Sequence, residues 1–138
     1  MNILIIDGQG GGMGKQLVAA LKRRFPDFTL TAVGTNSAAT VAMHKAGADH
    51  TATGENAVIV NSRRADLIIG ALGIVIADSL LGEITPAMAV AVGQSSARRI
   101  LIPINRCDNI VAGLPELPLS ELLAKVLAEV EELAEQNA

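Results

Sequence analysis

The sequence predicts a three-layer α/β domain in which helices cover both faces of a doubly wound parallel sheet. Three observations lead to this fold class. Strand-like and helical patterns alternate about five times along the 138 residues, as in chains of βαβ units. The first strand-like run, residues 2–6, is almost continuously aliphatic, as expected of a central strand buried on both faces. A glycine-rich stretch then joins this run to the first helical pattern.

Five segments have the composition of strands. They span residues 2–6, 28–33, 49–52, 66–70 and 99–104. The first and fourth are apolar runs, which favour burial on both faces, and the second alternates β-branched side chains. Pro103 lacks an N–H group and therefore places the fifth strand at an edge of the sheet.

Helices are expected over residues 16–25, 38–46, 57–64, 86–93 and 118–136. Pro26 ends the first and Gly47 ends the second. Thr85 is a good N-cap for the fourth, with Pro86 at its first position. Because connections between parallel strands are right-handed, these elements favour a five-stranded sheet of order 3-2-1-4-5 in a single domain over residues 1–138.

The last helix has the strongest periodic signal in the chain, an apolar stripe opposite a charged face. The stripe consists of Leu119, Leu122, Leu123, Val126, Leu127, Val130 and Leu133. It is interpreted either as packing on the sheet or as a homodimer contact.

Composition excludes several classes of protein. Half of the residues are hydrophobic and mainly aliphatic, which suits a parallel sheet covered by helices. The net charge of −3 and a pI near 5.3 argue against nucleic acid as the main partner. Cys107 is the single cysteine, so no intrachain disulfide is possible. Without a recognisable signal peptide or membrane-spanning run, we expect a cytoplasmic protein.

The candidate site is centred on the sequence DGQGGGMGK, residues 7–15. Clustered glycines let phosphate oxygens approach backbone amides closely, and a following helix adds free N–H groups and a positive dipole end. The predicted cofactor-binding residues in this stretch are Gly8, Gln9, Gly10, Gly11, Gly12, Met13 and Gly14. For Asp7, which precedes them, the default interpretation is that it caps the glycine turn. The alternative is that it holds a ribose hydroxyl or an ion.

Two nucleotide motifs compete for this stretch. Gly8, Gly10 and Gly14 form a seven-position variant of the dinucleotide fingerprint. Gly8, Gly12 and Gly14 match the spacing of short-chain dehydrogenases, which the stretch resembles. Gly14-Lys15 matches the end of a P-loop, and residues 11–15 together resemble the deviant Walker loop of partitioning ATPases. However, Gln16 stands where a P-loop needs Ser or Thr for Mg²⁺. The sequence therefore favours the dinucleotide interpretation.

One departure from the dinucleotide pattern bears on the ligand. An acidic residue that binds a ribose is expected at the end of the second strand, but residues 34–37 read Gly-Thr-Asn-Ser. Thr35 and Asn36 are predicted to contact the ribose or a 2′-phosphate instead. The alternative is that they only cap the next helix. The ligand is thus NAD(P) or a related adenine nucleotide.

Other predicted site residues follow the remaining strands, because ligands bind beyond the carboxyl ends of an open parallel sheet. Glu55 and Asn56 are placed for base or sugar contacts, and Gly73 and Ile74 for the approach of a ring. The segment Asn105–Cys107 would lie on the same rim, where Arg106 would bind a phosphate or a substrate carboxylate.

No catalytic set is evident in the sequence. There is no Tyr for a Tyr–Lys pair, no Ser-His-Asp set, and no standard metal-ligand spacing, so no metal is predicted. The preferred function is a stand-alone nucleotide-binding module that acts as a sensor or accessory subunit. Alternatives are a small NAD(P)-dependent reductase, a degenerate P-loop hydrolase, and an interaction protein with no ligand.

Several motifs together resemble a family of short bacterial proteins classed as a domain of unknown function. They are Ile6–Gly12, Gly34–Asn36, Ala52–Ala57, Leu81–Pro86 and Asn105–Cys107. The resemblance covers roughly residues 1–112. It implies a stand-alone Rossmann-like domain and brings no assigned reaction.

Overall fold

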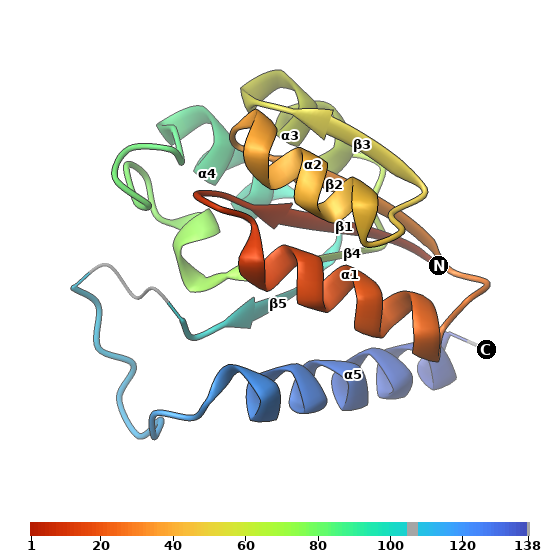
Figure 1. Cartoon of the computed structure of the whole chain (residues 1–138). Coiled ribbons are helices and arrows are strands. Elements are labelled where there is room, and N and C mark those ends of the chain that lie inside the picture. Colours follow the sequence, from red (N-terminus) through yellow and green to blue (C-terminus); the bar gives the residue numbers. More distant parts are fainter. Residues whose placement is uncertain (105–107, 138) are drawn as a thin grey trace.

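The sheet contains five parallel strands in a computed structural model that describes residues 1–104 and 108–137 (Figure 1). The strands are β1 (Asn2–Asp7), β2 (Thr29–Gly34), β3 (His50–Thr53), β4 (Leu67–Ala71) and β5 (Arg98–Ile102). Their order across the sheet is β3-β2-β1-β4-β5. The predicted doubly wound sheet and its strand order are therefore confirmed.

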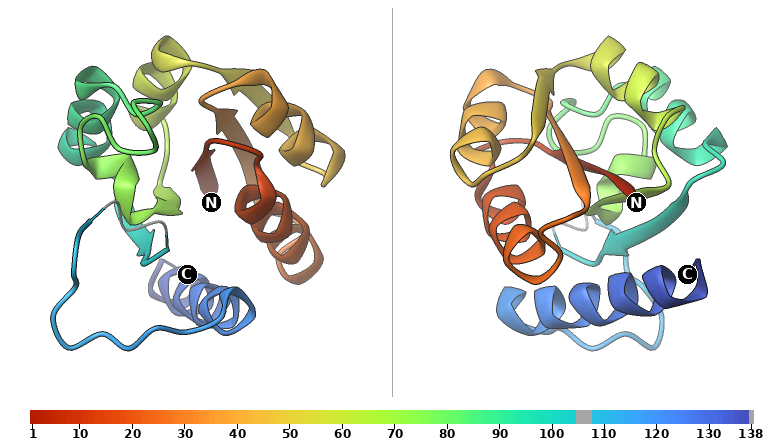
Figure 2. Two further views of the ribbon diagram at one scale, coloured as in Figure 1. Left: turned by 60° about the vertical axis from the view of Figure 1, so that its left-hand side comes forward. Right: turned by 90° about the vertical axis from the view of Figure 1, so that its right-hand side faces the viewer.

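Helices cover both faces of the sheet. They are α1 (Gly12–Arg24), α2 (Ser37–Lys45), α3 (Glu55–Ser62), α4 (Pro86–Gln94) and α5 (Leu119–Gln136), with a short 3₁₀ helix, η1 (Leu72–Val75). Figure 2 shows α1, α2 and α5 on one side of the sheet and α3 and α4 on the other. The result is the predicted three-layer arrangement.

The alternation of β1 divides the core into two halves. Ile3 and Ile5 point into the half formed with α1, α2 and α5, and Leu4 and Ile6 point into the half formed with α3 and α4. All four side chains are almost completely buried. This two-sided burial explains why the strand reads as a continuous apolar run.

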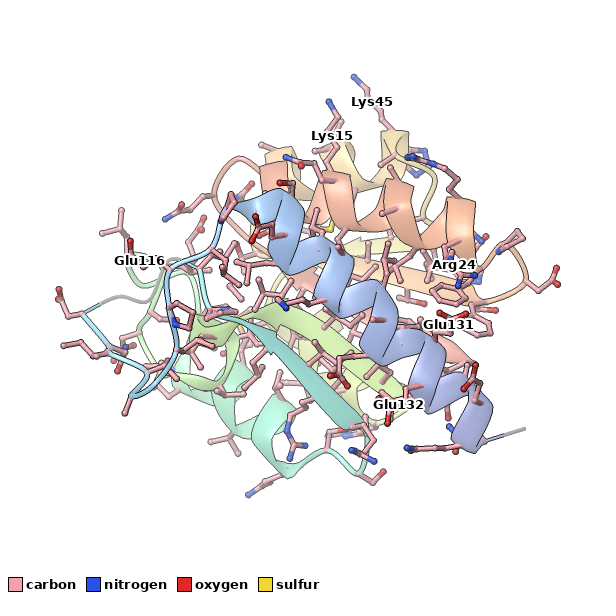
Figure 3. All side chains as sticks on the ribbon, turned by 90° about the horizontal axis from the view of Figure 1, so that it is seen from below. Lys15, Arg24, Lys45, Glu116, Glu131 and Glu132 are labelled. Carbon is pink, nitrogen blue, oxygen red and sulfur yellow. The ribbon has the colours of Figure 1, made fainter. Side chains whose placement is uncertain are left out.

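The last helix packs on its own chain. Its buried side chains are Leu122, Leu123, Val126 and Val130, which join the core cluster of β1 and α1. On its polar face, Glu131 forms an ion pair with Arg24 of α1 (Figure 3). The interpretation of the apolar stripe as packing on the sheet is confirmed. The homodimer stays a prediction.

Several elements differ from those predicted, and α1 begins at Gly12 rather than at residue 16. Residues 72–75 form the 3₁₀ helix η1 inside a segment expected to be a loop. The third helix begins at Glu55 rather than Ala57, because Gly54 adopts a positive φ and ends the preceding turn. The fifth strand ends at Ile102, so Pro103 follows it, although β5 does lie at the sheet edge.

Within residues 1–104 and 108–137, no helix combines the length and the apolar composition that crossing a membrane requires.

Candidate functional site

The glycine loop, residues 8–14, lies where the sheet reverses its winding. β1 pairs with β2 on one side and with β4 on the other, so Asp7 is opposite Gly34 and Ile6 is opposite Gly70. The loop therefore leaves the carboxyl end of the central strand between the ends of two neighbours. In open α/β sheets this is the place where ligands bind.

Asp7 holds the two ends of the glycine loop together. Its carboxylate accepts a hydrogen bond of 2.9 Å from the Gly8 amide and one of 2.7 Å from the Gly14 amide. The residue is only 9% exposed, and burial raises the pKa of its carboxyl, while the two amides oppose that shift. The predicted capping role of Asp7 is confirmed.

The glycines of the loop serve different purposes. Gly11 has a φ of +74°, and a Cβ built on it would lie 2.7 Å from the Ala39 Cα atom of α2. A Cβ built on Gly14 would lie similarly close to side-chain atoms of Asp7 and Met43. In contrast, a Cβ built on Gly10 or Gly12 meets nothing within 4 Å. Packing thus requires Gly11 and Gly14, whereas Gly10 and Gly12 face open space.

Three backbone amides of this loop remain unpaired. Among the residues that the structure describes, the amides of Gly10, Gly12 and Met13 have no hydrogen-bond acceptor. The amides of Gly8, Gln9, Gly11 and Gly14 all have one. The unpaired groups lie at or just before the start of α1, a 13-residue helix with no acidic side chain in its first turn. Such a helix start attracts anions.

Glu83 links the glycine loop to the residue that caps α2. Glu83 was not singled out from the sequence. Its Oε1 atom accepts a hydrogen bond of 2.6 Å from the Gln9 amide, and its Oε2 atom accepts one of 2.8 Å from the Asn36 side-chain amide. Asn36 also donates to the Gln9 carbonyl at 2.9 Å and caps α2 by accepting from the Ala39 amide. One carboxylate thus joins the glycine loop to the end of β2.

Glu83 belongs to a covering segment, residues 76–84, that lies between η1 and α4 beyond the carboxyl end of β4 (Figures 1 and 2). Asp78, Leu80 and Leu81 all have positive φ angles there, which are uncommon for residues other than glycine. The Ser79 hydroxyl donates to the Gly73 carbonyl, and Leu80 is buried in the core. Neighbouring Leu81 is 97% exposed. These contacts fix the position of Glu83.

Comparisons with known proteins support the expected resemblance. A family model described as "Domain of unknown function (DUF3842)" matches residues 2–135. The chain belongs to this family. The match includes the last helix, which the resemblance in sequence motifs did not reach.

Among solved structures, the chain is similar in fold to the dodecameric FMN-dependent UbiX-like decarboxylase from Escherichia coli O157:H7, with a TM-score of 0.46 and 17% sequence identity. The similarity covers 94% of each chain. A comparison with curated protein sequences found no match.

In this member of the DUF3842 family, some predicted site residues come together and others do not. Thr35 and Asn36 lie beside the glycine loop, as expected. Glu55 instead accepts a hydrogen bond of 2.6 Å from the Thr85 hydroxyl, and Asn56 is exposed in the first turn of α3. In the part of the chain that the structure describes, neither side chain forms a hydrogen bond with the glycine loop.

The 3₁₀ helix gives two other predicted residues a packing role. Ile74 is 1% exposed and belongs to the core. A Cβ built on Gly73 would lie 2.8 Å from the Ser79 hydroxyl oxygen, so the covering segment fills the space in which we expected a ring. The predictions for Asn105, Arg106 and Cys107 lie outside the described residues.

The described part of the chain contains no group of three or more His, Cys, Asp or Glu residues that could hold a metal ion. The polar groups next to the glycine loop are two carboxyls, Asp7 and Glu83, the Asn36 amide and the Thr35 hydroxyl. This set can bind a polar ligand by accepting and donating hydrogen bonds.

Proposed function

We propose that this protein binds NAD(P) or a related adenine nucleotide, with a phosphate group at the start of α1. The observation that carries this proposal is the set of unpaired amides of Gly10, Gly12 and Met13. They are the amides of the glycine loop that the protein does not pair, and they occur at the switch point of the sheet. Phosphate oxygens accept hydrogen bonds from such groups at the positive end of a helix.

The position of Lys15 favours the dinucleotide interpretation over a P-loop. A P-loop lysine reaches the phosphates that the loop holds. Here Lys15 lines a groove of about 500 Å³ between α1 and α2, together with Ser37, Val41 and Lys45. Figure 3 shows Lys15 and Lys45 extending on the same side of the molecule. Lys15 therefore takes part in the helix surface rather than in the glycine loop.

We further propose that the protein is a binding module, which acts as a sensor or as an accessory subunit. Asp7, Glu83 and Asn36, beside the glycine loop, are already hydrogen-bonded to backbone amides or to one another. This arrangement holds a ligand in place. A reductase or a hydrolase would need a proton donor or a metal ligand aimed at a reacting atom.

Replacing Gly12 by Val tests the proposal. We expect the variant to bind NAD⁺, NADP⁺ and ADP about tenfold or more weakly in titration calorimetry, because the isopropyl group stands where the phosphate approaches. The fold should be retained, since a Cβ at Gly12 meets nothing within 4 Å.

Gly93→Val is the matched control for this variant, because Gly93 is also a helical glycine with open space around it. It should leave nucleotide affinity unchanged. If the wild-type protein binds none of the three nucleotides, or if Gly12→Val binds them as tightly as wild type does, the proposed function is wrong.

A further inference from the structure

The end of β2 lacks the acid that dinucleotide-binding domains place there to hold a ribose. β2 ends at Gly34, and Thr35 and Asn36 follow it. In the folded chain, however, a carboxylate is present at this point. It comes from Glu83, which is 74 residues away from Gln9 along the chain but bonds directly to its amide.

The carboxylate of Glu83 lies against the first glycine of the loop. A Cβ built on Gly8 would be 2.7 Å from Glu83 Oε1 and equally 2.7 Å from the Thr35 hydroxyl oxygen. The other carboxylate oxygen bonds to Asn36, the residue that caps α2. The charge is therefore located between the ends of β1 and β2, beside the first residues of the glycine loop.

The Glu83 carboxylate can accept further hydrogen bonds. An ionised carboxylate offers about four lone-pair sites, and the structure uses two of them, for Gln9 and Asn36. Glu83 is half-buried, so its remaining sites are reachable. The nearby Thr35 hydroxyl is buried without a hydrogen-bond partner among the residues that the structure describes. The reachable Glu83 carboxylate suits a sugar that carries two neighbouring hydroxyls.

We propose that Glu83 is the ribose-binding acid of this site, so that the ligand is an adenine dinucleotide with a free 2′-hydroxyl, NAD rather than NADP. This proposal rests on the proposed function above. The acid that is absent from the end of β2 is supplied by Glu83 of the covering segment. Hydrogen bonds from Gln9 and Asn36 hold its carboxylate in position.

The same charge makes the site selective against a 2′-phosphate. A 2′-phosphate in place of the 2′-hydroxyl that Glu83 holds would face the negative charge of this carboxylate. Neither of the two ion pairs in residues 1–104 and 108–137 brings an Arg or a Lys to Glu83. Among the described residues, a 2′-phosphate would thus meet the Glu83 charge without an Arg or Lys paired to it.

Titration calorimetry with NAD⁺ and NADP⁺ tests the inference, because the two differ only in the 2′-phosphate. We expect the wild-type protein to bind NAD⁺ about tenfold or more tightly than NADP⁺. Glu83→Gln should weaken NAD⁺ binding about tenfold and bring the two affinities close together, since a charge-assisted hydrogen bond and the repulsion are both lost. Asp78→Asn, which removes one negative charge from the same segment at an exposed residue, should keep the wild-type preference.

Three outcomes overturn this assignment. Wild-type protein that binds NADP⁺ as tightly as NAD⁺ would show that Glu83 does not select the ribose. Tighter NAD⁺ binding by Glu83→Gln would show that the carboxylate blocks the site instead of forming part of it, and unchanged binding would show that it plays no part. Absence of any nucleotide binding by the wild type would instead refute the proposed function, on which this inference depends.

Discussion

Replacing Asp7 by Ala should lower the stability of the protein by about 3 kcal/mol, since two buried amides lose their acceptor at a cost of about 1–3 kcal/mol each and the cost of burying the carboxyl is removed. Those amides belong to Gly8 and Gly14, the two ends of the glycine loop. For a chain of 138 residues this corresponds to a fall in Tm of about 10 °C, measured by thermal unfolding. Asp27→Ala, at an exposed turn, should change Tm very little.

The effect of Asp7→Ala should depend on pH in a defined direction. Burial raises the pKa of Asp7 above its ordinary value of 3.8, against the hydrogen bonds from Gly14 and Gly8. The folded state therefore holds the proton more tightly than the unfolded state. The stabilising contribution of this protonation is complete below 3.8 and is lost as the pH rises through the folded pKa.

The difference in unfolding free energy between wild type and Asp7→Ala should consequently be larger near pH 4 (about the ordinary Asp value) than at neutral pH. Denaturant unfolding at both pH values measures it. A difference that grows towards neutral pH would contradict a raised pKa, and a Tm equal to that of wild type would contradict the role of Asp7 in closing the loop.

Among the three consecutive glycines, residues 10–12, Gly11 should be the most sensitive to substitution. We expect Gly11→Ala to lower the free energy of unfolding by about 3 kcal/mol. About 1–2 kcal/mol arises because Ala disfavours the left-handed conformation, and the remainder because its Cβ overlaps backbone. The φ of Gly11 is +74°, and the Cβ would stand 2.7 Å from the Ala39 Cα atom, which cannot move without shifting α2. Denaturant unfolding of the purified variant gives the loss in free energy.

The adjacent residue provides the control for this prediction. Gly12→Ala should stay within about 1 kcal/mol of wild type, because Gly12 is at the first position of α1 and a Cβ there meets nothing within 4 Å. Equal effects of the two substitutions would show that the run of glycines is uniform, and that the structural distinction between Gly11 and Gly12 is wrong.

Local patterns in the sequence were sufficient to predict most of the fold. The aliphatic runs of β1 and β4 and the stripe of α5 follow from burial, and Thr85 with Pro86 marks the start of α4, where the Thr85 hydroxyl accepts from the Met88 amide. Element boundaries were less predictable. The start of α3 at Glu55 depends on the backbone of Gly54, which composition alone does not reveal.

The candidate site was predictable where its groups are neighbours in sequence or directly follow a strand, as Thr35 and Asn36 do. Asp7 and the glycine loop are adjacent, so their relation could be inferred from spacing. Glu83 belongs to a segment in which three residues other than glycine have positive φ angles. No local pattern in the sequence indicates that this segment brings a side chain to the glycine loop. The stretch 81–86 was among the motifs that carried the family resemblance, but nothing in it assigned a role to Glu83.

The same limit explains why Gly73 and Ile74 have packing roles that were not predicted from the sequence. Their position after a buried strand pointed to the ligand rim, as the general rule for parallel sheets predicts. The rule does not specify what else occupies that rim. In this chain Ser79 and Leu80 pack onto the strand ends, so Ile74 is part of the core and Gly73 is covered.

Amide NMR spectra of the labelled protein during a titration with NAD⁺ would test the central claim most directly. The account predicts the largest shift changes at the amides of Gly10, Gly12 and Met13, with smaller changes at Gln9 and Asn36, whose hydrogen bonds to Glu83 adjust to the ribose. Shift changes that leave these glycine-loop amides untouched, or a spectrum that NAD⁺ does not alter at all, would contradict it.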